Sequence, residues 1–131
     1  MSDRPNPLLT ASAVLYFAAA VPLLFAPQEL LGWAGDVETP GRVAVLQVLG
    51  SALFGYSMLN WANRYARVEG IFGRPLLIAN LAHAASAALL LLRVAIEMSF
   101  APVVAVPTAI YLLLAVAFGA RLFRAPEPEG D

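Results

Sequence analysis

Four runs of predominantly apolar residues constrain this chain more than any other feature of its sequence. They occupy residues 8–26, 43–62, 76–97 and 100–123. A helix needs about 20 apolar residues to cross the hydrocarbon core of a bilayer. Inside lipid, every backbone N–H and C=O group must find its partner within the protein, which a helix provides. The sequence therefore predicts an all-α fold, a four-helix transmembrane bundle.

The composition supports a membrane protein of one domain. The chain has 131 residues, of which 60% are hydrophobic and 13% are charged, whereas soluble domains are typically about 45–50% apolar. A soluble protein of this length cannot bury so much apolar surface in a single core. We therefore expect residues 1–131 to form a single membrane domain with the lipid bilayer as its solvent.

The arginines predict the orientation of the spans. If both termini are cytoplasmic, Arg42 and Arg93 are the only two arginines on the outer side. The cytoplasmic side then holds the other six, Arg4, Arg64, Arg67, Arg74, Arg121 and Arg124. Because cytoplasmic loops carry an excess of Lys and Arg, we expect both termini inside.

The connection over residues 27–41 then lies outside the membrane. Apolar residues in its first half, among them Trp33, predict a short helix lying in the interface, with Asp36 and Glu38 in water. At the other end of the chain, residues 124–131 are rich in proline and acidic residues. Such a composition is typical of a disordered tail.

Polar residues inside the apolar runs are the candidates for a functional site. The helical rise of about 1.5 Å per residue places His83, the only histidine, near the middle of the bilayer. A candidate ligand-binding site around it comprises His83, Asn80, Gln47, Ser51, Tyr16 and Tyr111. His83 is open to four interpretations: a neutral side chain that fastens helices, a proton-titrating group, a ligand contact, or one axial haem ligand completed by a partner subunit.

Helical spacing predicts which faces of the second and third runs pack. Each has a stripe that mixes small residues with hydrogen-bonding ones, as close helix contact in membranes requires. The stripe of the second run comprises Gln47, Gly50, Ser51, Phe54, Met58 and Trp61. That of the third comprises Asn80, His83, Ala84, Ala87, Leu91 and Val94. We expect these two helices to form a packed pair.

Arg93 and Glu97 stand four residues apart near the end of the third run. Side chains at this spacing share a helix face and can form an ion pair. Near the outer surface such a pair can reach water along its own side chains and fix the depth of the helix. A gate or a ligand contact is the alternative interpretation.

No recognisable catalytic or metal-binding pattern occurs in the sequence. The chain has no cysteine and one histidine, and it contains no HExxH motif, glycine-rich phosphate loop or acidic metal motif. A Ser-His-Asp hydrolase would need a carboxylate at the depth of His83, and none occurs there. The net charge of −1 argues against nucleic-acid binding. We expect no catalytic residues, no metal and no cofactor.

Three segments resemble a known group of proteins. They are LFAPQELLGWAG (residues 24–35), GRVAVLQVLGSALFGYSMLNWANR (41–64) and RPLLIANLAHAASAALLLL (74–92). Their hydropathy rhythm and the placement of Gly, Trp and Arg are similar to those of the DoxX-like proteins, small and largely uncharacterised four-span bacterial membrane proteins. The resemblance implies a four-helix bundle in the bacterial inner membrane, and it assigns no catalytic residue.

Three functions remain open from the sequence. The first is a structural or accessory helix bundle without enzymatic activity. It forms a homo-oligomer, for which the alanine-rich third run offers a flat docking surface. The second is a binder or transporter of a small or lipophilic molecule held around His83, Asn80 and Gln47. The third is an integral membrane enzyme that acts on a lipid-like substrate with His83 as its acid or base. The sequence favours the first.

Overall fold

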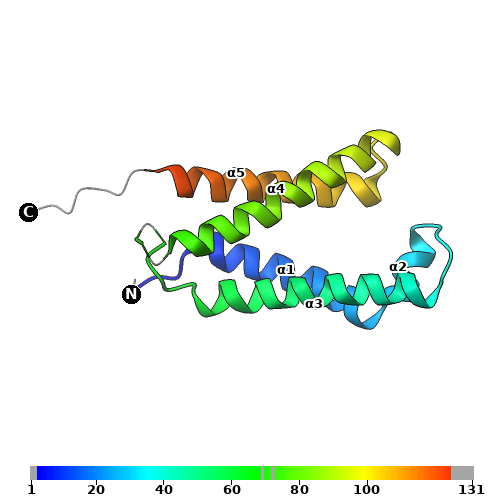
Figure 1. The fold of residues 1–131 in the computed structure, drawn as a ribbon, viewed down its shortest axis with the longest axis horizontal. Helices are drawn as coiled ribbons and strands as arrows, with labels where there is room; N and C mark the ends of the chain where they lie inside the picture. Colours follow the sequence, from blue (N-terminus) through cyan, green and yellow to red (C-terminus); the bar gives the residue numbers. More distant parts are fainter. Residues whose placement is uncertain (1–2, 69, 72, 125–131) are drawn as a thin grey trace, which may run out of the picture. The chain divides into compact units, whose positions relative to one another are not determined.

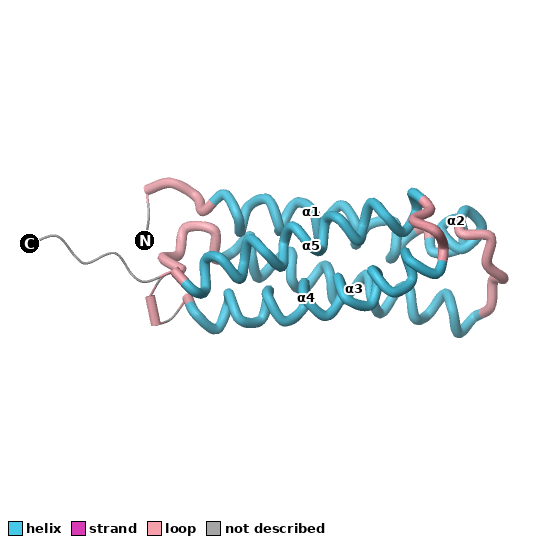
Figure 2. The backbone as a smooth tube through the Cα atoms, turned by 90° about the horizontal axis from the view of Figure 1, so that it is seen from above, coloured by secondary structure: helices cyan, strands magenta, loops and turns pink. Residues whose placement is uncertain are grey.

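The computed structural model describes residues 3–68, 70–71 and 73–124, and its regular structure in this part of the chain is entirely helical (Figures 1 and 2). The helices are α1 (Pro7–Phe25), α2 (Pro27–Trp33), α3 (Pro40–Ala62), α4 (Arg74–Glu97) and α5 (Pro102–Phe123). All except α2 are long and apolar enough to cross a membrane. The prediction of an all-α protein with four candidate spans is therefore confirmed.

Prolines determine where these helices begin. Each of the five has a proline at its first or second position, where the missing N–H costs nothing and the fixed φ suits a helix. Two starts also carry a side-chain cap, Asn6 before α1 and Thr39 before α3. The helices α1, α3 and α4 therefore begin before the first three apolar runs, whereas α5 begins two residues after the start of the fourth run. An apolar run therefore indicates that a span is present, but it does not give the residue at which the helix begins.

The described residues form two compact units, one within Ser2–Tyr65 and one within Ala66–Asp131. Each unit is a helical hairpin. In the first hairpin α1 packs along α3, with the short α2 between them in sequence; in the second α4 packs along α5. The predicted pairing of the second and third runs concerns α3 and α4, which belong to different units, and it stays a prediction.

The first hairpin packs through small and polar residues. The buried residues of α1 are Leu9, Ser12, Ala13, Tyr16 and Ala20, and those of α3 are Gly50, Leu53, Ser57 and Asn60. Gly50 lies at a close approach of the two helices, because a Cβ atom there would be 2.9 Å from the Leu23 Cβ.

Of the stripe predicted on α3, only Gly50 is among the residues buried in the first hairpin, and the expected contact of that stripe with α4 stays a prediction. The residues Gln47, Ser51, Phe54, Met58 and Trp61 are exposed. Ser57 and Asn60 occupy the contact with α1, because their polar groups need partners that lipid cannot supply. The large apolar side chains can face lipid without cost, since lipid tails are as apolar as they are.

The second hairpin repeats the packing scheme of the first. The buried residues of α4 are Leu77, Asn80, Ala84, Ala88 and Ala95, and those of α5 are Thr108, Leu114 and Phe118. Along α1 the residues Leu9, Ser12, Tyr16 and Ala20 are separated by three, four and four residues, and along α4 the same separations join Leu77, Asn80, Ala84 and Ala88. Of the stripe predicted on α4, Asn80 and Ala84 are buried and Val94 is exposed, and its expected contact with α3 stays a prediction.

The two hairpins turn differently. In the first, α2 occupies the expected connection, followed by Gly35 with φ +69°, while its position in an interface stays a prediction. In the second, four residues separate the helices, and Ser99 and Phe100 have φ of 51° and 57°. This left-handed pair lets the Phe100 N–H bond to the Ala95 carbonyl (2.7 Å).

The expected disordered tail lies, beyond Arg124, outside the described residues.

Candidate functional site

A buried polar cluster joins the helices of the first hairpin. The Ser57 hydroxyl donates to the Ala13 carbonyl (2.8 Å), and the Asn60 amide donates to the Ser12 hydroxyl (2.9 Å). The Ser12 hydroxyl in turn donates to the Leu9 carbonyl of its own helix (3.1 Å). Asn60 and Ser12 are completely buried. The cluster lies near the end of the hairpin at which α1 begins and α3 ends.

The chemistry of this cluster is that of a helix fastener. The hydrogen bonds of Ser57, Asn60 and Ser12 described above join an amide, hydroxyls and backbone carbonyls. Hydrogen bonds of this kind between membrane helices are worth about 0.6 kcal/mol on average and up to about 1.7 kcal/mol. Ser57 bonds directly to the α1 backbone, which requires the two helices to lie close together.

His83 joins the helices of the second hairpin. Its Nε2 atom lies 3.3 Å from the Tyr111 hydroxyl on α5, and which group donates depends on the imidazole tautomer. The two rings also meet edge to face, with their centroids 5.5 Å apart. Both side chains are half-buried. Of the four interpretations open from the sequence, this geometry favours a side chain that fastens α4 to α5.

Other polar side chains of the second hairpin bond to their own helix. The Asn80 amide donates to the Leu76 carbonyl (3.0 Å), and the Thr108 hydroxyl donates to the Val104 carbonyl (2.7 Å). The Ser86 hydroxyl donates to the carbonyls of Ala82 (2.7 Å) and His83 (3.1 Å). Such bonds to the preceding turn let short polar side chains occupy an apolar helix.

The six residues of the predicted ligand site divide between the units. Tyr16, Gln47 and Ser51 belong to the first hairpin, and Asn80, His83 and Tyr111 belong to the second. The structure brings His83 and Tyr111 together, with Asn80 one turn earlier on α4. A single site made of all six stays a prediction.

The first-hairpin members of that set have contacts of their own. The Gln47 amide donates to the Leu24 carbonyl (3.3 Å), and the Ser51 hydroxyl donates to the Val48 carbonyl (2.8 Å). The Tyr16 ring meets the Tyr56 ring edge on, at 6.1 Å between centroids. Gln47 thus bridges α3 to α1, whereas Ser51 bonds only within its own helix.

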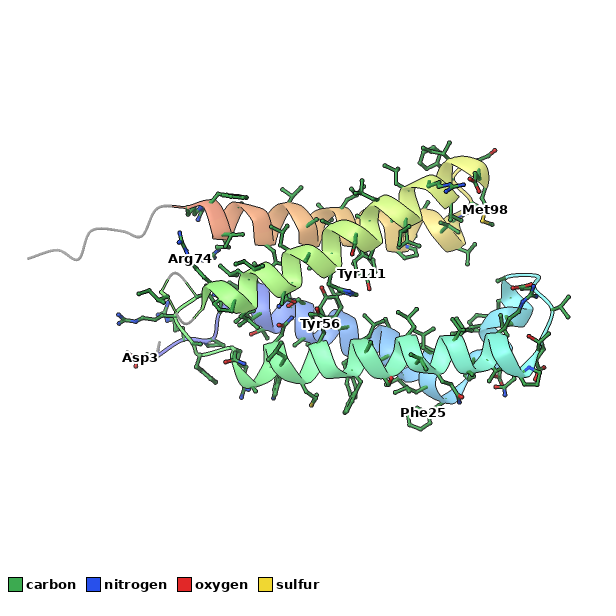
Figure 3. The ribbon with its side chains drawn as sticks, in the orientation of Figure 1. Asp3, Phe25, Tyr56, Arg74, Met98 and Tyr111 are labelled. Atoms are coloured by element: carbon green, nitrogen blue, oxygen red, sulfur yellow. The ribbon has the colours of Figure 1, made fainter. Side chains whose placement is uncertain are left out.

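Ion pairs occur at the turn end of each hairpin. Arg93 Nε lies 3.1 Å from Glu97 Oε1, with both side chains exposed, and Arg42 pairs with Asp36 beside the start of α3. Met98 and Arg74 mark the turn end and the open end of the second hairpin (Figure 3). The two arginines at the turn ends are therefore neutralised by neighbouring carboxylates.

An apolar groove on the first hairpin was not anticipated from the sequence. It has a volume of about 290 Å³ and is lined by Ala13, Val14, Phe17, Ser57, Met58 and Trp61. Trp61 is the only lining residue at a helix end. In the sequence, the sign of this groove is that the small residues Ala13 and Ser57 stand among larger ones. That sign can be used only once α1 and α3 are known to pair.

The described part of the chain contains no group of three or more His, Cys, Asp or Glu residues that could hold a metal ion. Comparison with known proteins found no matching family model, no matching curated protein and no matching solved structure. The fold and these contacts define the chain as a helical, multi-pass type of membrane protein. Its function is therefore argued from its own residues.

Proposed function

We propose that this chain is a structural or accessory membrane protein, a four-helix bundle with both termini in the cytoplasm of a bacterium, which self-associates in the inner membrane. The observation that carries self-association is an exposed small-residue face on α3. Ser51 and Gly55 stand four residues apart on this face, and both are exposed. Small residues at this spacing let membrane helices approach closely.

The geometry of this face suits a second helix. A Cβ atom added to Gly55 would meet nothing within 4 Å, so the glycine serves no contact inside the hairpin. The Ser51 hydroxyl is folded back onto the Val48 carbonyl, which keeps the surface flat. Gly50, next to Ser51 in the sequence but on another side of α3, has the opposite character because it is packed against α1. The two glycines thus support different contacts.

The interior of each hairpin supports a structural role. Ser57, Asn60 and His83 each make a hydrogen bond to the other helix of their hairpin or to a side chain on it. Polar groups that are used to join helices give a bundle a defined register without providing chemistry. The two alternatives that place a ligand at His83, a lipophile-binding site and an enzyme, would require this side chain to act on that ligand.

Self-association is tested by counting subunits in lipid. The protein, labelled with one fluorophore per chain, is reconstituted into liposomes at high dilution and its photobleaching steps are counted. We expect more than one step per particle for the wild type and a shift towards single steps for Gly55→Ile, since the branched side chain prevents close approach.

The matched control is Ala18→Ile, which adds the same side chain to an exposed position of α1. It should leave the subunit count unchanged. A wild type that bleaches in single steps throughout, or a Gly55→Ile variant that retains the wild-type count, would overturn the proposal of self-association through this face.

A further inference from the structure

The groove of the first hairpin combines an apolar interior with a fixed positive charge at one end. Its lining residues lie within two five-residue segments, 13–17 of α1 and 57–61 of α3. Five helical residues span only about 6 Å along the axis, whereas a helix with its side chains is about 10 Å wide. The groove is therefore too short to hold a helix of a second copy, but it can hold a segment of a hydrocarbon chain.

Arg64 provides the charge. Its guanidinium carbon lies 4.1 Å from the centre of the Trp61 ring and 4.8 Å from that of Tyr65. Its Nη1 atom also donates to the Trp61 carbonyl (2.6 Å). Trp61 thus lines the groove with its ring and holds the arginine with the same ring, by a cation–π contact. Charge and groove are connected through one side chain.

Among the described residues, the Arg64 guanidinium makes one hydrogen bond to the protein. A guanidinium group has five N–H donors, and the described contacts use one, to the Trp61 carbonyl. No ion pair joins Arg64 to any carboxylate among residues 3–68, 70–71 and 73–124. The backbone bond from the Asn6 N–H to the Arg64 carbonyl (2.5 Å) brings the segment that carries Arg4 to the same end. An anion is the complementary partner for such an end.

We propose that this groove binds an anionic phospholipid, with a segment of one acyl chain between α1 and α3 and the phosphate at Arg64. Arginine binds phosphate through two parallel N–H···O bonds, and tryptophan is favoured at the level of lipid headgroups. A phospholipid whose headgroup carries a positive charge, such as phosphatidylcholine, would place that charge beside the arginine. The site therefore discriminates against such a lipid. This inference goes beyond the proposed self-association and does not depend on it.

Quenching of Trp61 fluorescence tests the site directly. The chain has two tryptophans, so a Trp33→Phe background leaves Trp61 as the only reporter. This protein is reconstituted into bilayers that contain rising fractions of phosphatidylglycerol or phosphatidylcholine with brominated acyl chains, which quench tryptophan on contact. A single basic residue near anionic lipid is worth about 1 kcal/mol, so we expect about a fivefold preference for phosphatidylglycerol.

Variants separate the charge from the groove. Arg64→Gln should abolish the preference, and Arg64→Lys should retain part of it. Arg42→Gln is the matched control, because Arg42 lies at the opposite end of α3, and it should change nothing. Val14→Phe should fill the groove and reduce quenching by both lipids, whereas Val48→Phe, equally apolar and exposed but outside the groove lining, should not.

Two results would overturn the proposal. The first is the absence of an Arg64-dependent preference, seen as equal quenching by the two lipids in the wild type or as a preference that survives Arg64→Gln. The second is weak quenching by both lipids that rises in Gly55→Ile, since a second copy of the chain would then cover the groove. A lipid preference that persists in Gly55→Ile supports the lipid site even if self-association fails, so the two proposals can fail separately.

Discussion

Single residues decide how the polar groups of this chain are used. His83 is the clearest case, because it is the only histidine and lies within a helix that is apolar enough to cross a membrane. Its contact with the Tyr111 hydroxyl, at 3.3 Å from Nε2, connects α4 to α5. A glutamine can also donate and accept hydrogen bonds, whereas leucine can do neither.

We expect His83→Gln to preserve most of the stability of the protein in detergent. His83→Leu and Tyr111→Phe should each lower the free energy of unfolding by about 0.6–1.7 kcal/mol, the range for hydrogen bonds between membrane helices. The double variant His83→Leu/Tyr111→Phe should cost little more than either single change, because both remove the same bond. Thermal unfolding of the four variants measures this.

A functional histidine would behave differently. If His83 binds a ligand, both His83→Gln and His83→Leu should remove a co-purified molecule, detected by native mass spectrometry, while the fold is retained. That outcome, or additive costs in the double variant, would contradict the fastening role of His83.

At the scale of the helix, the closeness of α1 and α3 depends on one glycine. A Cβ atom at Gly50 would lie 2.9 Å from the Leu23 Cβ and 3.1 Å from the Leu24 nitrogen. The backbone atom cannot move aside without displacing α1 itself. Gly55, on the same helix, has open space at this position.

We therefore expect Gly50→Ala to destabilise the first hairpin by about 1–3 kcal/mol, the usual cost of overpacking. Gly55→Ala should cause no loss, because alanine favours a helix more than glycine does and remains small enough for close helix contact. Thermal unfolding of both variants in detergent compares them. Equal stability of the two variants would show that α1 and α3 do not approach each other at Gly50.

The helices themselves could be predicted from the sequence, but their partners could not. Apolar runs locate helices because only a helix satisfies the backbone in lipid. They do not identify the packed face, since both faces of such a helix are apolar. On α3 the predicted stripe contains Met58 and Trp61, whereas the buried residues of this helix include Ser57 and Asn60. Hydrogen bonds to α1 decide this, and they depend on a helix 44 residues away in the case of Ser57 and Ala13.

The candidate site shows the same limit. The sequence singled out His83 and Tyr111 as polar groups of similar depth, and the structure pairs them. It did not identify the groove beside Trp61, because that feature depends on gaps between side chains of two helices. Composition indicates which residues are unusual in lipid, and pairing indicates what they contact.

At the scale of the whole molecule, the two hairpins share one plan. Each places a proline at its start, a buried polar residue about one turn later and alanine further on, as at Ser12 and Ala20 or Asn80 and Ala88. Each carries an ion-paired arginine at its turn end. The connection from α3 to α4, residues 63–73, is too short to cross a bilayer as a helix, and an extended segment would leave its backbone groups without partners in lipid. We therefore expect the open ends of both hairpins on the same, arginine-rich side.

The central claim, four spans with both termini in the cytoplasm, is tested most directly by the accessibility of single cysteines. The chain has no cysteine of its own, so each substitution gives an unambiguous signal with a membrane-impermeant maleimide applied to intact spheroplasts. Val37→Cys and Met98→Cys, at the two turn ends, should be labelled from outside. Asp3→Cys, Ile71→Cys and Arg124→Cys should be labelled only after permeabilisation. Labelling of Arg124→Cys in intact spheroplasts, or protection of Val37→Cys, would contradict this topology.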